Sequence, residues 1–194
     1  MTIELTAPPY TRAVPLPARV VAAILRERLP GVGVKKVHKL LYYCQGHHLA
    51  MFGRPLFDET VSAWDMGPVV GSLWFAEKQG VVPVDAPSTS VGEAELNTLG
   101  YVVSRYGRLS GRDVEILSHA EDPWQRAGRS RRPGESVRIE LEWMRDYFAA
   151  GDDDDEIAID SEVVSQWLAG AGERSQRPAA PGDPQRLRAR LERA

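Results

Sequence analysis

The sequence contains only one cysteine, Cys44, among its 194 residues. One cysteine cannot form an internal disulfide, and this favours a reducing compartment such as the cytoplasm. No apolar stretch approaches the roughly 18 uninterrupted residues of a membrane-spanning helix, because charged residues interrupt every run. Residues 1–17 contain Glu4 and several prolines before any apolar run, so we expect no signal peptide. These absences favour a soluble, cytoplasmic protein.

Excess positive charge is also missing. The net charge is −3, which does not suit a protein that follows the phosphates of a nucleic acid. The charge is unevenly placed, because residues 170–194 carry six arginines against three acidic residues, and an acidic run at 152–156 precedes them. We therefore expect neither nucleic-acid nor membrane binding, and a basic tail on an acidic body points weakly to a protein partner.

Apolar periodicity predicts a mainly α-helical fold. The strongest pattern advances in steps of three and four residues, and its members are Val34, Val37, Leu41, Cys44, His48 and Met51. This spacing predicts a helix of about five turns with a broad buried face. We expect Gly53 to cap its C-terminus, and Lys35, Lys36 and Lys39 to lie largely on its solvent side.

Five further helices are expected around this one, together with short strands. The first begins at Pro17, the next has Pro68 as its first residue, a third spans residues 93–106, a fourth follows Ser110 and ends at Pro123, and the last lies between 141 and 151. Ser110 and Asp113 are spaced as a capping box. Residues 56–64 predict a short strand or an ordered loop, and residues 137–139 predict a second short strand.

The chain accordingly divides into four segments. Residues 1–16 are expected to form an extended arm, and residues 17–151 a compact domain of about six helices with one or two short strands. Residues 152–169 are interpreted as an acidic linker followed by a short helix. Residues 170–194 have the composition of a flexible basic tail.

Three motifs follow one another in the central part of the chain. The first is residues 39–46 (KLLYYCQG), the second includes residues 64–69 (WDMGPV), and the third includes residues 119–124 (HAEDPW). Each is weak alone, but together and in this order they resemble the Panacea domain, a SocA-like antitoxin domain of a phage-associated family. The resemblance covers roughly residues 35–148, so the two ends of the chain lie outside it.

The resemblance implies an antitoxin encoded beside its toxin, and phage defence is the expected role of the pair. Toxins of this family include small alarmone synthetases and other growth inhibitors, and neutralisation is mostly by direct protein binding. One branch of the family delivers its toxin to a protease. The family has no established catalytic residues, so the resemblance implies no enzyme activity and no cofactor.

Two chemical alternatives are weighed against simple packing. Cys44 and His48 lie one turn apart, as two zinc ligands would, and His38, His47 and His119 are further candidates. A nucleophilic triad could also be drawn from Cys44, His119 and Asp122. A cysteine in the middle of an apolar stripe is usually an inert packing residue, so we favour no metal and no catalytic group.

The motif residues are interpreted as mainly structural, with a binding groove as the alternative for the tryptophans and the Gly-Pro turn. These residues are Lys39, Tyr42, Gln45, Trp64, Gly67, Pro68, His119, Pro123 and Trp124.

Partner contacts are predicted elsewhere, on aromatic residues around the acidic run and on the basic tail. Tryptophan, tyrosine and arginine often anchor interfaces, because they bury a large area and keep a polar group available. The predicted contact residues are Trp143, Tyr147, Phe148, Trp167, Leu168, Arg186, Arg188 and Leu191. The leading hypothesis is therefore a toxin-binding antitoxin. The alternatives are a proteolytic adaptor, and a DNA-binding regulator of its own operon, for which no basic recognition helix is visible.

Overall fold

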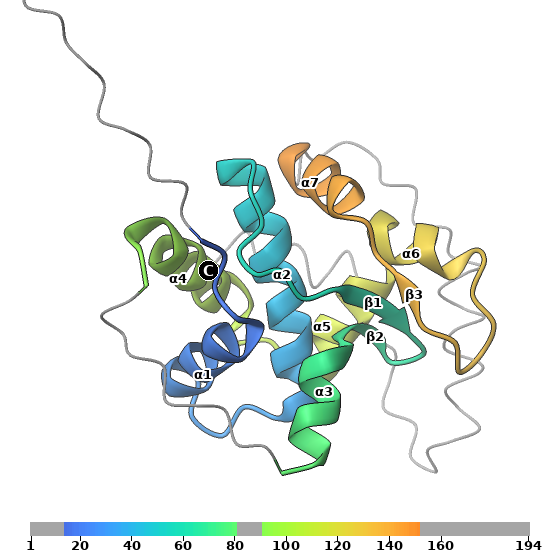
Figure 1. Ribbon diagram of the computed structural model, residues 1–194, viewed down its shortest axis with the longest axis horizontal. Coiled ribbons are helices and arrows are strands. Elements are labelled where there is room, and N and C mark those ends of the chain that lie inside the picture. Colours follow the sequence, from blue (N-terminus) through green and yellow to red (C-terminus); the bar gives the residue numbers. More distant parts are fainter. Residues whose placement is uncertain (1–13, 81–90, 152–194) are drawn as a thin grey trace, which may run out of the picture.

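A computed structural model describes residues 14–80 and 91–151, and within them it contains seven helices and a three-stranded sheet (Figure 1). The predicted mainly helical fold with short strands is confirmed. The elements are α1 (Ala18–Arg28), α2 (Val34–Phe52), β1 (Val61–Trp64), β2 (Gly67–Val70), α3 (Gly71–Lys78), α4 (Glu93–Tyr106), α5 (Gly111–His119), α6 (Asp122–Gly128), β3 (Val137–Arg138) and α7 (Leu141–Ala149). None of the described helices is long and apolar enough to cross a membrane.

Helix α2 forms the centre of the molecule. It is in contact with α1, α4, α5, α7 and β2, which surround it (Figure 1). Leu40, Leu41 and Cys44 are fully buried on it, as the apolar periodicity predicted. The predicted cap is also confirmed, because Gly53 has a φ of 66° and its N–H donates to the carbonyl of Leu49 at 2.9 Å.

The expectation for Lys39 is wrong. Lys35 is exposed and Lys36 half-buried, but Lys39 is only 2% exposed. Periodicity places Lys39 beside the polar positions, whereas strand β2 and helix α5 both pack against α2. A helix with neighbours on nearly every side has little solvent face, so one lysine of the three is enclosed.

The predicted helix start at Pro68 is also wrong, because residues 67–70 form a strand. Strands β1 and β2 pair as an antiparallel hairpin in which Trp64 is opposite Gly67, and the sheet order is β2-β1-β3. Pro68 therefore lies in an edge strand, where its missing N–H need not break the ladder. Helix α3 begins three residues later than predicted, at Gly71.

Pro123 lies near the start of a helix and does not end one. Helix α5 stops at His119, and Pro123 occupies the first turn of the short helix α6, which is the element missing from the predicted set. Proline is well suited to a first helical turn, because the N–H it lacks would have no partner within the helix.

Several local predictions are confirmed. The Ser110 hydroxyl accepts from the Asp113 N–H at 3.1 Å, and the Ser110 N–H donates to the Asp113 carboxylate at 2.9 Å, which completes the capping box. Helix α4 has the predicted bounds, and the second predicted strand is present as β3. Most of the predicted arm, the predicted linker helix and the predicted tail fall in residues 1–13, 152–169 and 170–194, which lie outside the described residues.

Helix α7 packs closely on α2 through a glycine. A Cβ at Gly46 would overlap the ring of Phe148, whereas a Cβ at Gly100 in α4 would meet only the end of Arg28 at 3.6 Å. The ring of Phe148 lies 5.5 Å from that of Tyr42, edge to face. Gly46 is therefore the position that lets α7 approach α2.

Gly46→Ala should destabilise the protein by about 1–3 kcal/mol, because α7 must move outward. The same substitution at Gly100 should be neutral or stabilising by up to about 1 kcal/mol, because alanine is the better helix former. Urea unfolding of both variants checks the prediction. Equal effects at the two positions would contradict it.

Candidate functional site

The three sequence motifs meet at one place in the fold. Lys39 comes from α2, Gly67 and Pro68 from β2, His119 from the end of α5 and Trp124 from α6. We call these five residues the motif junction. A Cβ at Gly67, whose φ is 93°, would lie 2.8 Å from Cε of Lys39 and 3.1 Å from Cε1 of His119. Only glycine fits this turn, which explains why the motif carries one there.

Lys39 is the most unusual group of the junction. Its Nζ donates to the carbonyl of Pro68 at 3.1 Å inside the protein. Burial lowers the pKa of Lys39 to about 7, against the opposing effect of the Glu115 carboxylate. The amine thus ties the central helix to the edge strand.

His119 connects three further parts of the chain at the junction. Its Nδ1 lies 2.7 Å from the carbonyl of Glu115, and its Nε2 lies 3.3 Å from the carbonyl of Asp65. The ring also packs edge to face on Trp124, with centroids 4.2 Å apart. Burial lowers the pKa of His119 to about 4, so the ring is neutral at physiological pH and donates to one carbonyl at a time.

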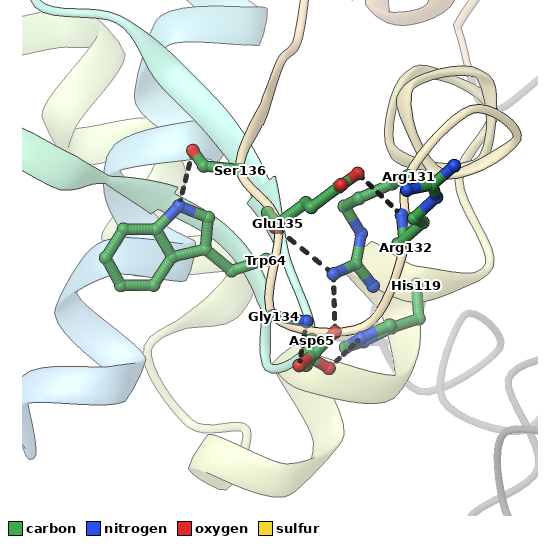
Figure 2. Close-up of polar contacts among 8 residues, drawn as sticks. All are labelled: Trp64, Asp65, His119, Arg131, Arg132, Gly134, Glu135 and Ser136. Atoms are coloured by element: carbon green, nitrogen blue, oxygen red, sulfur yellow. Dashed lines mark hydrogen bonds and ion pairs between the residues drawn. The ribbon is translucent and has the colours of Figure 1, made fainter.

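Asp65 lies in the turn between β1 and β2 and binds the loop that leads to β3 (Figure 2). Its carboxylate accepts from Nη1 of Arg131 and from the Gly134 N–H, the latter at 3.0 Å. The guanidinium of Arg131 lies over the Trp124 ring, 5.9 Å from its centroid. No local pattern singles out Asp65 or Arg131, because their ion pair joins residues 66 positions apart.

Gln45 forms hydrogen bonds with the backbone of the segment before β1. Its side-chain oxygen accepts from the N–H groups of Leu56 and Phe57, at 2.9 and 3.2 Å, and its Nε2 donates to the carbonyl of Phe57 at 2.9 Å. The side chain thus completes the hydrogen bonds of a buried backbone segment. Tyr42 is fully buried, and burial raises its pKa.

The groups considered for zinc or nucleophilic chemistry are used in packing. Burial raises the pKa of the Cys44 thiol, which makes it a poor nucleophile at neutral pH. His48 Nδ1 lies 2.8 Å from the Thr98 hydroxyl, and His47 Nε2 lies 2.9 Å from the Tyr106 hydroxyl. In the described ranges, no three His, Cys, Asp or Glu residues are placed to hold a metal ion.

The predicted partner-binding residues that can be placed lie on α7. Trp143, Tyr147 and Phe148 are all half-buried, and Trp143 and Phe148 pack against the core. The predicted contacts Trp167, Leu168, Arg186, Arg188 and Leu191 lie outside the described residues. The role of all eight in binding stays a prediction.

A more exposed aromatic surface lies on β1 and α3. It consists of Trp64, Trp74 and Phe75, and we call it the aromatic shelf. The centroid of the Trp64 ring lies 6.1 Å from that of Trp74 and 5.9 Å from that of Phe75, and Phe75 is 57% exposed. The sequence analysis missed Phe75; the adjacent aromatics Trp74 and Phe75 on a short helix were the available signal.

Residues 37–125 match the family described as antitoxin SocA-like, Panacea domain. This part of the chain is therefore similar to a Panacea domain. The predicted family is thereby confirmed, and the whole motif junction lies within the matched range. Helix α7 follows the matched range and nevertheless packs on its central helix. Comparisons with curated proteins and with solved structures give no significant match.

The enclosed amine of Lys39 should give stability a measurable pH dependence. An unfolded chain keeps the Lys39 proton up to a pH of about 10.5, whereas the folded chain releases it near pH 7. Between these values the unfolded state binds more protons, so the free energy of unfolding rises with pH, by at most about 1.4 kcal/mol per pH unit.

Urea unfolding of wild type and Lys39→Met between pH 6 and 9 checks this prediction. The stability of the wild type relative to the variant should be flat below pH 7 and should increase above it. The same change at the exposed Lys78 is the control and should leave the pH slope as it is. Parallel curves for wild type and Lys39→Met would contradict the prediction.

Proposed function

We propose that the chain is an antitoxin that neutralises its toxin by binding it directly, without catalysing a reaction. The Panacea domain, which belongs to an antitoxin family, supports this proposal. The observation that carries it is the use of the motif side chains: Lys39, Gln45 and His119 all contact backbone atoms of the chain itself. Side chains that join neighbouring elements build a scaffold and need no substrate.

The mechanism we propose is occlusion. A protein that covers the toxin's active site, or binds only an inactive conformation, inhibits without chemistry. A Kd of about 1 nM corresponds to about −12 kcal/mol. Such an affinity is commonly reached with a well-packed interface of about 1,600 Å². We expect the toxin to be a small alarmone synthetase or another growth inhibitor, and both proteins to act in the cytoplasm.

Co-expression tests the proposal. The product of each gene adjacent to the one that encodes this chain is expressed in a bacterial host, with and without the chain. One of these products should stop growth alone, and growth should return when the chain is present. The two proteins should then purify together as a stable complex.

Two further measurements separate the mechanisms. Cys44→Ala should still restore growth, because direct binding needs no nucleophile. The half-life of the toxin should stay constant when the chain is present. A shorter half-life would show that the chain delivers the toxin to a protease and does not neutralise it by binding alone. Failure to bind or rescue any adjacent product would refute the proposal.

A further inference from the structure

Trp64 is the motif residue that the scaffold does not enclose. It is half-buried at the end of β1, whereas Lys39, Gly67, His119 and Trp124 are buried. Along β1, Val61 and Ala63 point into the core, so Ser62 and Trp64 point to the other face of the sheet. On that face Trp64 meets the two aromatic residues of α3, and together they form the aromatic shelf.

Internal contacts hold two rings of the shelf in place. The indole N–H of Trp64 donates to the Ser136 hydroxyl at 2.8 Å (Figure 2). Trp74 packs edge to face against the buried His38, with ring centroids 5.4 Å apart. Phe75 rests against Trp64 and leaves most of its own surface uncovered. A surface of fixed aromatic rings loses little conformational entropy on binding, which favours affinity.

Two cations lie at the rim of the shelf. On the α3 side, the amine of Lys78 lies 5.9 Å from the centroid of the Trp74 ring, and it has no ion pair with any described residue. On the β3 side, Arg138 is paired with Ser62 across the strands, so its side chain lies on the same face as Trp64. Its ion pair with Glu140 is exposed, and exposed ion pairs are weak enough to be exchanged for another carboxylate.

We propose that the aromatic shelf is the surface that docks the toxin, and that the docked segment carries an apolar side chain flanked by carboxylates. This inference rests on the proposed function. The apolar side chain covers Phe75, and the carboxylates pair with Lys78 and Arg138. Aromatic residues that lie on a rigid support and are surrounded by polar groups are the usual anchors of protein interfaces.

The charges favour a protein over a nucleic acid as the occupant. Two cations at the rim match two carboxylates, whereas nucleic-acid affinity depends on many cations placed along the phosphates. The net charge of −3 would also oppose a polyanion. Aromatic rings can stack on bases as well, so binding to DNA is an outcome that the experiment must distinguish.

The test uses the full chain and the adjacent-gene product that it neutralises. The Kd of their complex is measured by calorimetry for wild type, Phe75→Ala and Lys78→Glu. Phe75→Ala should weaken binding about 30-fold, as expected for an anchor residue. Lys78→Glu should weaken it about tenfold, and Lys78→Arg should bind like wild type, because the positive charge is kept. Added salt should weaken the wild-type complex more than the Lys78→Glu complex.

The control is Tyr101→Ala, which removes another exposed aromatic side chain, on α4. It should bind like wild type. Thermal melting of all variants shows whether they are folded; because Phe75 and Lys78 are exposed, their substitutions should leave the melting temperature nearly unchanged.

The possible failures can be told apart. If wild type and the Phe75 and Lys78 variants bind the toxin equally well, the shelf is not the docking surface, and the proposed function stands. If these variants instead lose salt-sensitive binding to promoter DNA, the shelf is a nucleic-acid surface and the inference is overturned. If wild type binds no adjacent-gene product, the proposed function fails, and the inference fails with it.

Discussion

The burial of α2 on nearly all sides is the constraint on which the rest of the structure depends. A polar side chain inside a protein costs about 1–3 kcal/mol when it lacks a hydrogen-bond partner. On α2 such groups reach outward: His38 accepts from the Val70 N–H, Gln45 binds the backbone before β1, and His48 lies against the Thr98 hydroxyl. Each of these contacts holds a different neighbour. The polar residues of α2 therefore help to determine how the hairpin, the segment before β1 and helix α4 are placed around it.

Local sequence patterns correctly predicted those features that depend only on residues close together in the sequence. The apolar spacing of α2, its glycine cap and the capping box of α5 follow from residues a few positions apart, and the structure confirms them. The two prolines were misread, because a proline in an edge strand, at a helix start or after a helix end satisfies the same local rule. Lys39 shows the same limit, since only the packing of β2 and α5 decides that its position is enclosed.

The candidate site could be predicted only in part. The motif residues were identified, and a structural role was favoured for them. Their contacts with one another could not be predicted, because they lie on elements that are far apart in the sequence. No spacing rule shows that Gly67 must leave room for Lys39 and His119. The shelf was missed for a related reason: Trp64 and Phe75 become neighbours only because β2 turns directly into α3. Exposure, which distinguishes Phe75 from a core aromatic residue, is a property of the folded chain.

The contact between Phe148 and Gly46 has a consequence for the smallest fragment that can fold. The family match ends at residue 125, yet the ring that covers this part of α2 comes from a helix beyond it. A fragment cut at the match boundary would leave Tyr42 and Tyr43 without the ring that packs on both, and would give water access to the middle of the core. The packed unit therefore includes helix α7, which ends at Ala149, although the family match ends before this helix.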